Sequence, residues 1–114
     1  MSELANTPGV IPYMEAHAGP RRLLTVVSEA PSMFSNATRP VIIIDGRAFH
    51  VMWGPVTFEI PADRNVHVAG HVLANDPTGH ASILLEPGPQ DEQLGYKVRS
   101  MSNLGEFHRA SYGY

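Results

Sequence analysis

The chain has 114 residues and no cysteine. This absence excludes disulfides, cysteine-ligated zinc, iron–sulfur clusters and thiol nucleophiles. Long apolar runs are also missing: the longest strongly apolar run is Val41 to Ile44, whereas a membrane-spanning helix needs about 20 residues. The N-terminal stretch has no basic segment followed by an apolar one, so no secretory signal is predicted. We expect a cytoplasmic protein without direct membrane insertion, with a place at the periphery of a membrane complex as the alternative.

Charge is scarce as well. Charged residues make up 17% of the chain, against about 25% in ordinary globular proteins. The formal net charge is −3, and among the basic residues only Arg21 and Arg22 are adjacent. Nucleic-acid binding requires a concentrated basic surface, so we expect no nucleic-acid partner. Either a protein partner or a second copy covers part of the surface, or the chain is a weakly charged monomer.

Signatures of catalysis are missing too. The sequence contains no GxSxG nucleophile motif, no phosphate-binding loop and no dinucleotide-binding fingerprint. No pair of carboxylates stands out as the acid and base of a glycosidase. We therefore expect a protein that is not an enzyme and that uses no cofactor.

What the chain does contain is a series of short apolar segments, most clearly between Pro40 and Val72. Val41 to Asp45 is β-branched and apolar, which favours a buried strand. The Asp45-Gly46 dipeptide that follows is typical of a tight hairpin turn. Arg47 to Trp53 is the returning strand, and Gly54-Pro55 ends it. Five further strands are predicted around Arg21–Glu29, Val56–Ile60, Val66–Ala74, Ala81–Leu85 and Leu94–Val98.

Seven short strands separated by turn residues predict an all-β protein. We interpret them as a single antiparallel β-sandwich of the immunoglobulin-like type, although a small barrel has the same spacing. The predicted organisation is an extended N-terminal arm over residues 1–20, a sandwich domain over residues 21–100 and a C-terminal tail over residues 101–114. A short helix around Leu104 to Ala110 is the alternative within that tail.

The order of these segments resembles a PEGA-type domain between about Pro40 and Arg99. The residues that carry the resemblance are Asp45-Gly46, Trp53-Gly54, Phe58-Glu59-Ile60-Pro61-Ala62 and Val66-His67-Val68. Asp63-Arg64 stands where such domains have a glycine. The resemblance implies a small β-sandwich that acts as a structural or adhesive module, often attached to cell-surface or membrane proteins, without catalytic residues.

Six histidines are the one unusual feature of the composition. Along one strand, His67 and His71 would lie about 13 Å apart, too far to share an ion. A hairpin would instead bring His80 diagonally close to His71, about 7 Å away at the backbone. Asp76 is the nearest carboxylate. A metal site formed by His71, His80 and Asp76 is one hypothesis, and surface or packed histidines without a ligand are the other.

Aromatic residues suggest two further hypotheses. Trp53 is either part of the core between the sheets or an exposed anchor of the kind that dominates interfaces. Aromatic and basic residues outside the predicted strands are expected to contact a partner, namely Tyr13, Phe107, Arg109, Tyr112 and Tyr114. The sequence thus favours a protein-interaction or structural module, as an accessory subunit of a larger or membrane-associated assembly. The alternative is a β-barrel that binds a small ligand or metal at its histidines.

Overall fold

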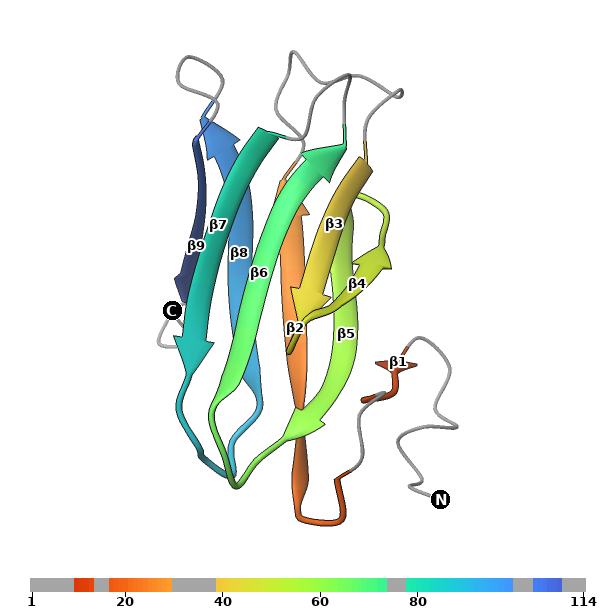
Figure 1. The fold of residues 1–114 in the computed structure, drawn as a ribbon, viewed down its shortest axis with the longest axis vertical. Coiled ribbons are helices and arrows are strands. Elements are labelled where there is room, and N and C mark those ends of the chain that lie inside the picture. Colours follow the sequence, from red (N-terminus) through yellow and green to blue (C-terminus); the bar gives the residue numbers. More distant parts are fainter. Residues whose placement is uncertain (1–9, 14–16, 30–38, 74–77, 100–103, 110–114) are drawn as a thin grey trace.

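The structure is a computed structural model, and it describes residues 10–13, 17–29, 39–73, 78–99 and 104–109. The protein is all-β: of the described residues 73% are in strands and none is in a helix. Nine strands form two sheets that lie one in front of the other (Figure 1). The strands are β1 (Val10–Ile11), β2 (Arg21–Glu29), β3 (Arg39–Ile44), β4 (Arg47–His50), β5 (Gly54–Pro61), β6 (Val66–Leu73), β7 (Thr78–Leu85), β8 (Glu92–Arg99) and β9 (Leu104–Arg109).

One sheet has five strands in the order β1-β5-β2-β8-β9, and the other has four in the order β4-β3-β6-β7. The prediction of seven strands is therefore wrong. The two additional strands, β1 and β9, lie in the segments expected to be an arm and a tail. β1 pairs with β5 over two residues, and β9 pairs with β8 along its whole length. These pairings use backbone hydrogen bonds, which need no alternating side-chain pattern.

The five-stranded sheet is also mixed, and this differs from the antiparallel sheet that we expected. β1 runs parallel to β5, and β2 runs parallel to β8. All pairs of the four-stranded sheet are antiparallel. Parallel neighbours need long connections, and residues 30–91 separate β2 from β8 in the chain. Alternation within a strand cannot reveal such a long-range pairing.

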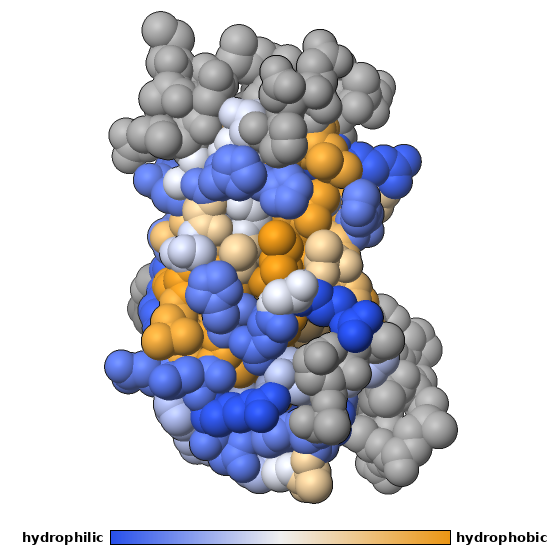
Figure 2. Space-filling view, in the orientation of Figure 1, coloured by the Kyte–Doolittle hydropathy of each residue, from blue (hydrophilic) through white to orange (hydrophobic). Residues whose placement is uncertain are grey.

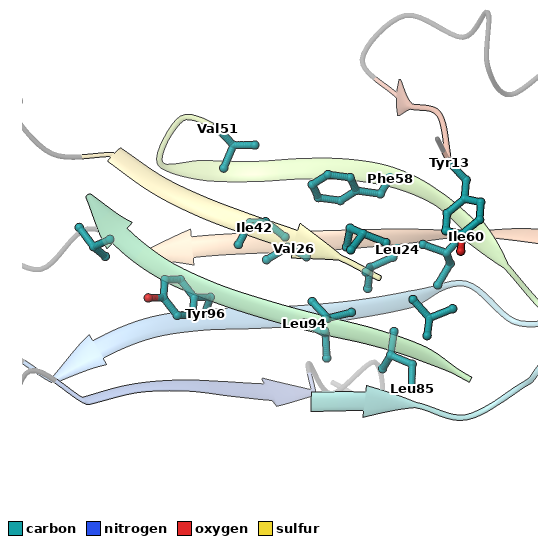
Figure 3. Packing of buried hydrophobic residues seen from close by; sticks show 14 of the residues in the cluster. Tyr13, Leu24, Val26, Ile42, Val51, Phe58, Ile60, Leu85, Leu94 and Tyr96 are labelled. Carbon is teal, nitrogen blue, oxygen red and sulfur yellow. The ribbon is translucent and has the colours of Figure 1, made fainter. Parts of the chain in front are cut away.

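Apolar side chains from both sheets meet in one core (Figure 3). On β2 the buried positions include Leu24 and Val26, while Leu23, Thr25 and Val27 are half-buried. Trp53 is partly buried and packs against this core. The other fully buried apolar residues of this core on the strands are Ile42, Phe58, Ile60, Val66, Val68, Val72, Leu85, Leu94 and Tyr96. Burial of these side chains is the main driving force that holds the two sheets together.

The hairpin between β3 and β4 confirms the predicted Asp45-Gly46 turn. Both residues have positive φ, 47° and 87°, as a two-residue turn of this kind requires. Asp45 also holds the N-terminal segment, because its Oδ2 accepts a hydrogen bond of 2.7 Å from the Tyr13 hydroxyl. Arg64 Nη2 donates to the same hydroxyl at 2.6 Å. Segments far apart in the sequence therefore meet at this turn.

At the opposite side of the molecule, β9 lies against β7. The Tyr96 hydroxyl donates a hydrogen bond of 2.5 Å to the carbonyl oxygen of Gly79. A Cβ atom at Gly105 would lie 1.8 Å from that same oxygen, so only glycine fits there. Phe107 packs on Tyr96 with the ring centroids 5.1 Å apart. These contacts join the two sheets along the β7–β9 edge.

Candidate functional site

The outer face of the four-stranded sheet is turned toward the viewer in Figures 1 and 2. Its residues alternate along each strand with the core residues. The backbone N–H of Val51 donates to the carbonyl oxygen of Pro40 at 3.1 Å, which places Met52 on the same face as Arg39. We call this surface the histidine face. Its outward residues are Arg39, Val41, Ile43, Ala48, His50, Met52, His67, Ala69, His71, Leu73, His80, Ser82 and Leu84.

Two histidines of this face contact each other. The imidazole rings of His71 on β6 and His80 on β7 have centroids 5.3 Å apart, with 34° between their planes. The prediction that the hairpin brings His80 near His71 is confirmed. The β6–β7 register shifts between Gly70 and Val72, which is a β-bulge, and such an irregularity re-aims a side chain relative to a regular strand.

The electrostatic surroundings favour a neutral His71. Burial lowers the pKa of His71, and the positive charges that His80 and His50 can carry lower it further. His50 lies in the same row of the sheet, since Val41 pairs with His50 on one side and with His71 on the other. A neutral imidazole keeps a lone pair on one ring nitrogen, so at neutral pH His71 can accept a hydrogen bond or bind a metal ion.

The rest of the histidine face is mainly apolar. Met52 and Leu84 are large hydrophobic residues that are 63% and 52% exposed. Between them runs a row in which Ile43 pairs with Ala48 and Ala69. Arg39, at one end, is the only Asp, Glu, Lys or Arg among the residues that we assign to this face. Figure 2 shows the result as orange atoms in the middle of the surface, between blue side chains.

The outer face of the five-stranded sheet has a different character. Lys97 Nζ lies 3.5 Å from Glu106 Oε1, and the hydroxyls of Thr25 and Thr57 are 2.9 Å apart. At the end near the N-terminal segment, Arg21 donates to the carboxylate of Glu59. These polar groups pair with one another across neighbouring strands: the Glu59 side chain is buried, whereas Lys97 and Glu106 are partly exposed.

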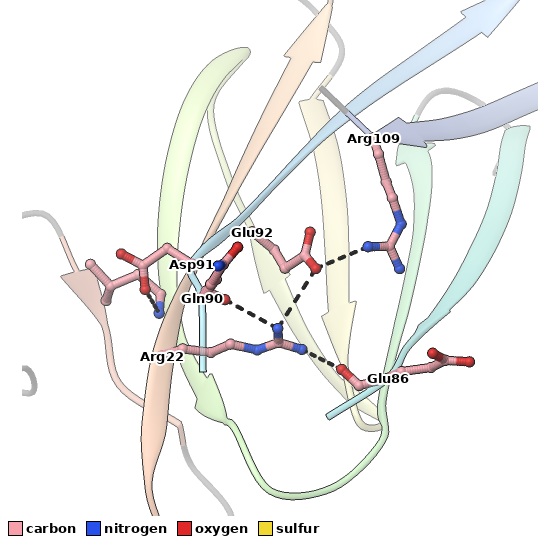
Figure 4. A network of polar contacts seen from close by, with 7 residues as sticks. Arg22, Glu86, Gln90, Asp91, Glu92 and Arg109 are labelled. Atoms are coloured by element: carbon pink, nitrogen blue, oxygen red, sulfur yellow. Dashed lines mark hydrogen bonds and ion pairs between the residues drawn. The ribbon is translucent and has the colours of Figure 1, made fainter. Parts of the chain in front are cut away.

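A hollow of about 210 Å³ beside the turn before β8 is the other polar feature (Figure 4). Arg22 is 4% exposed and donates to the carbonyl oxygens of Glu86, at 2.6 Å, and Gln90, at 3.1 Å. Glu92 Oε1 lies 3.6 Å from Arg22 Nη1 and 2.9 Å from Arg109 Nη1. The two guanidinium groups thus hold this turn and the end of β9 in place.

The predicted partner-binding residues occupy separate places. Tyr13 is only 8% exposed and bonds within the chain to Asp45 and Arg64. Phe107 is half-buried against Tyr96, and Arg109 pairs with Glu92. Tyr13 follows β1, and Phe107 and Arg109 lie on β9. β1 and β9 are the two outermost strands of the five-stranded sheet.

Three predicted residues cannot be placed in this way. Tyr112 and Tyr114, expected to contact a partner, lie outside the described residues, as does Asp76, the carboxylate of the hypothetical metal site. Within the ranges that the structure does describe, no group of three or more His, Asp or Glu residues is arranged to hold a metal ion. A metal site in this region therefore depends on the two imidazoles of His71 and His80.

Sequence reasoning missed the histidine face as a unit. His67 and His71 were placed on one strand face and His80 nearby, but His50 and Ile43 were not associated with them. The missing information was the strand order: β3 lies between β4 and β6, which puts three separate segments into one surface. The signal available in the sequence was the apolar character of Ala48, Ile43 and Ala69 at outward positions.

Comparisons with protein-family models, curated proteins and solved structures find no match for this chain. Across the described ranges, the structure contains no helix with the length and apolarity needed to span a membrane. The chemistry of the two outer faces is therefore the basis for a functional proposal.

Proposed function

We propose that this protein is a non-enzymatic β-sandwich module that associates with a second copy of itself through the histidine face. The observation that supports the proposal most directly is the exposure of Met52 and Leu84, at 63% and 52%, on that face. Met52 and Leu84 lie at opposite ends of the face, with the half-buried Ile43 and Ala69 between them, and exposed apolar patches commonly mark interaction sites. A surface that a partner covers needs few charged residues, and the histidine face therefore accounts for part of the low charge content of the chain.

A second copy is the occupant that suits the face best. In a two-fold arrangement each residue meets the same patch on the partner, so a face with many like charges would repel itself. The histidine face carries Arg39 as its single formal charge, at its end and away from Ile43 and Ala69. Two such faces can therefore approach without like-charge repulsion at their centres, and sheets stack face to face about 10 Å apart.

The size of the face predicts a weak dimer. The four strands have six, four, eight and eight residues, and with about 3.3 Å per residue and about 4.8 Å between strands they cover roughly 400 Å² on each copy, or about 800 Å² in total. Stable specific interfaces bury about 1,200 Å² or more in total, and smaller ones are weak and transient. We therefore expect a reversible equilibrium between monomer and dimer.

The resemblance of residues 40–99 to PEGA-type domains supports the same class of function. Such domains are structural or adhesive modules, and a module of this kind can serve as an accessory subunit of a larger assembly. The proposal for this chain is narrower, because it names the contacting surface and the second copy as the partner.

The experiment is sedimentation-velocity analysis of the full chain over a range of concentrations. Ala48→Glu places a carboxylate at an exposed position of the histidine face, and burying it in the dimer without a partner is costly. Gln93→Glu is the matched control, since Gln93 pairs with Thr25 on the outer side of the five-stranded sheet.

We expect the unmodified chain and Gln93→Glu to form dimers at high concentration, and Ala48→Glu to remain monomeric. Circular dichroism checks that both variants are folded. A chain that stays monomeric at every concentration, or a dimer that Ala48→Glu leaves intact, would refute the proposal.

A further inference from the structure

We propose that His71 and His80 together bind one divalent transition-metal ion of the zinc, copper or nickel class on the histidine face. The remaining coordination positions are open to water or to a donor group of another molecule. The site lies on the face proposed for self-association but does not require a second copy, because both ligands belong to one chain. Imidazole nitrogen is a preferred ligand for these metals, whereas Mg²⁺ and Ca²⁺ prefer oxygen.

The geometry of the pair supports a shared ion. A zinc ion binds imidazole nitrogen at about 2.0–2.1 Å with tetrahedral angles, which places two bound ring centroids about 5 Å apart. The centroids of His71 and His80 are 5.3 Å apart. The rings therefore already have the separation that a common tetrahedral ion requires.

The backbone around the pair explains how two neighbouring strands reach this arrangement. The bulge at Gly70 and Val72 interrupts the regular β6–β7 register where His71 is located. On the other strand, Gly79, next to His80, has φ +71°, a conformation that side-chain-bearing residues rarely adopt. Both irregularities adjoin the histidine pair, and bulges of this kind are frequent next to functional sites.

Within the described residues no further His, Asp or Glu joins the pair to form a group of three that could hold a metal ion. The nearest other histidine in this row, His50, is two strands away, about 9–10 Å by the strand spacing.

The described residues therefore supply two protein ligands. Structural zinc sites use four and catalytic zinc sites use three. We accordingly expect weaker binding than at a closed structural site, and an ion that exchanges and keeps open positions. An open site of this kind suits an ion that is sensed or passed on, or one that contacts a second molecule.

The test is isothermal titration of the metal-free full chain with ZnCl2, repeated with MgCl2. His80→Ala and His71→Ala each remove one of the two ligands, and His50→Ala is the matched control on the same face and in the same row. We expect one zinc ion per chain, a loss of about tenfold or more in affinity in each of the first two variants, no change in His50→Ala, and no heat with magnesium.

A second readout follows the imidazole resonances by NMR, which should shift for His71 and His80 while those of His50 stay in place. The titration is also done with Ala48→Glu, so that the result does not depend on self-association. If zinc fails to bind the unmodified chain, or if His50→Ala weakens binding as much as His80→Ala, the proposed site is wrong. Should dimers form without any zinc binding, the metal site fails while the proposed function stands.

Discussion

The outer face of the five-stranded sheet and the histidine face consist of strands of similar length that cover the same core. The first face carries paired polar side chains, such as Lys97 with Glu106 and Thr25 with Thr57. The second exposes Met52 and Leu84 and contains the contacting rings of His71 and His80. The polar groups of the first face thus have partners within the chain, whereas the second face leaves two large apolar side chains exposed.

This difference shows which features the fold itself requires. A two-sheet protein needs apolar side chains at inward positions and tolerates polar ones at outward positions. Thr25 and Lys97 satisfy that rule, whereas Ile43, Met52 and Leu84 depart from it without contributing to the inter-sheet core. Departures of this kind are expected at functional sites, and for that reason both proposals concern the histidine face.

The largest effect is expected from a comparison of two neighbouring isoleucines on β3. Ile42 points into the core and is fully buried, whereas Ile43 lies on the histidine face. Ile42→Ala should lower the free energy of unfolding by about 2–5 kcal/mol, because it leaves a cavity between the sheets. Ile43→Ala should lower it by less than about 1 kcal/mol in the monomer. Urea denaturation followed by circular dichroism measures both values.

The same pair tests association in the opposite direction. Ile43→Ala should weaken the dimer, and Ile42→Ala should leave it intact at urea concentrations where the variant is folded. Equal losses of stability in the two variants would mean that Ile43 is part of the structural core, and the contrast between the two sides of the sheet would then disappear.

Alkaline pH perturbs the interior that the two sheets share. Burial raises the pKa of Tyr96 above its ordinary value of 10.0. The folded protein therefore retains this proton where the unfolded chain releases it, so the contribution is complete below pH 10 and declines as the pH rises above it. We expect the free energy of unfolding to fall in this alkaline pH range. The two sheets should unfold together, because they share the core that contains Tyr96.

Tyr96→Phe is the control for this effect. The variant loses the hydrogen bond to Gly79 and is less stable at neutral pH, but its stability should depend less on alkaline pH. Tyr13 also has a raised pKa, chiefly through burial, so a smaller dependence should remain. An unchanged alkaline profile in Tyr96→Phe would contradict the assignment to Tyr96. Denaturant titrations across the pH range provide the measurement.

The smallest effect is expected on the outer face of the five-stranded sheet. Lys97 and Glu106 are both partly exposed, and their charged atoms are 3.5 Å apart. Such surface pairs contribute about 0–1 kcal/mol, so Lys97→Ala should change the free energy of unfolding by no more than this. It should also leave sedimentation unchanged. If the Lys97→Ala variant were monomeric, the interface would lie on this face and not on the histidine face.

One part of the site, the contact between His71 and His80, could be predicted from the sequence. Turn residues between two strands bring the ends of those strands together, so the approach of His80 to His71 follows from the chain between them. The approach of His50 does not, because β4 and β6 are separated by β3. That neighbourhood depends on which strands pair, and pairing is a non-local choice.

Local patterns of residues were enough to predict the all-β class, the Asp45-Gly46 turn and most of the strands, because alternation and turn chemistry act over a few neighbouring residues. The parallel pairing of β2 with β8, and the edge strand that Leu104–Arg109 forms against β8, arise from the folded arrangement. It also brought Ile43, Ala69 and Met52 into one exposed surface. These results depend on backbone hydrogen bonds and core packing between distant segments, and no local pattern of residues encodes them.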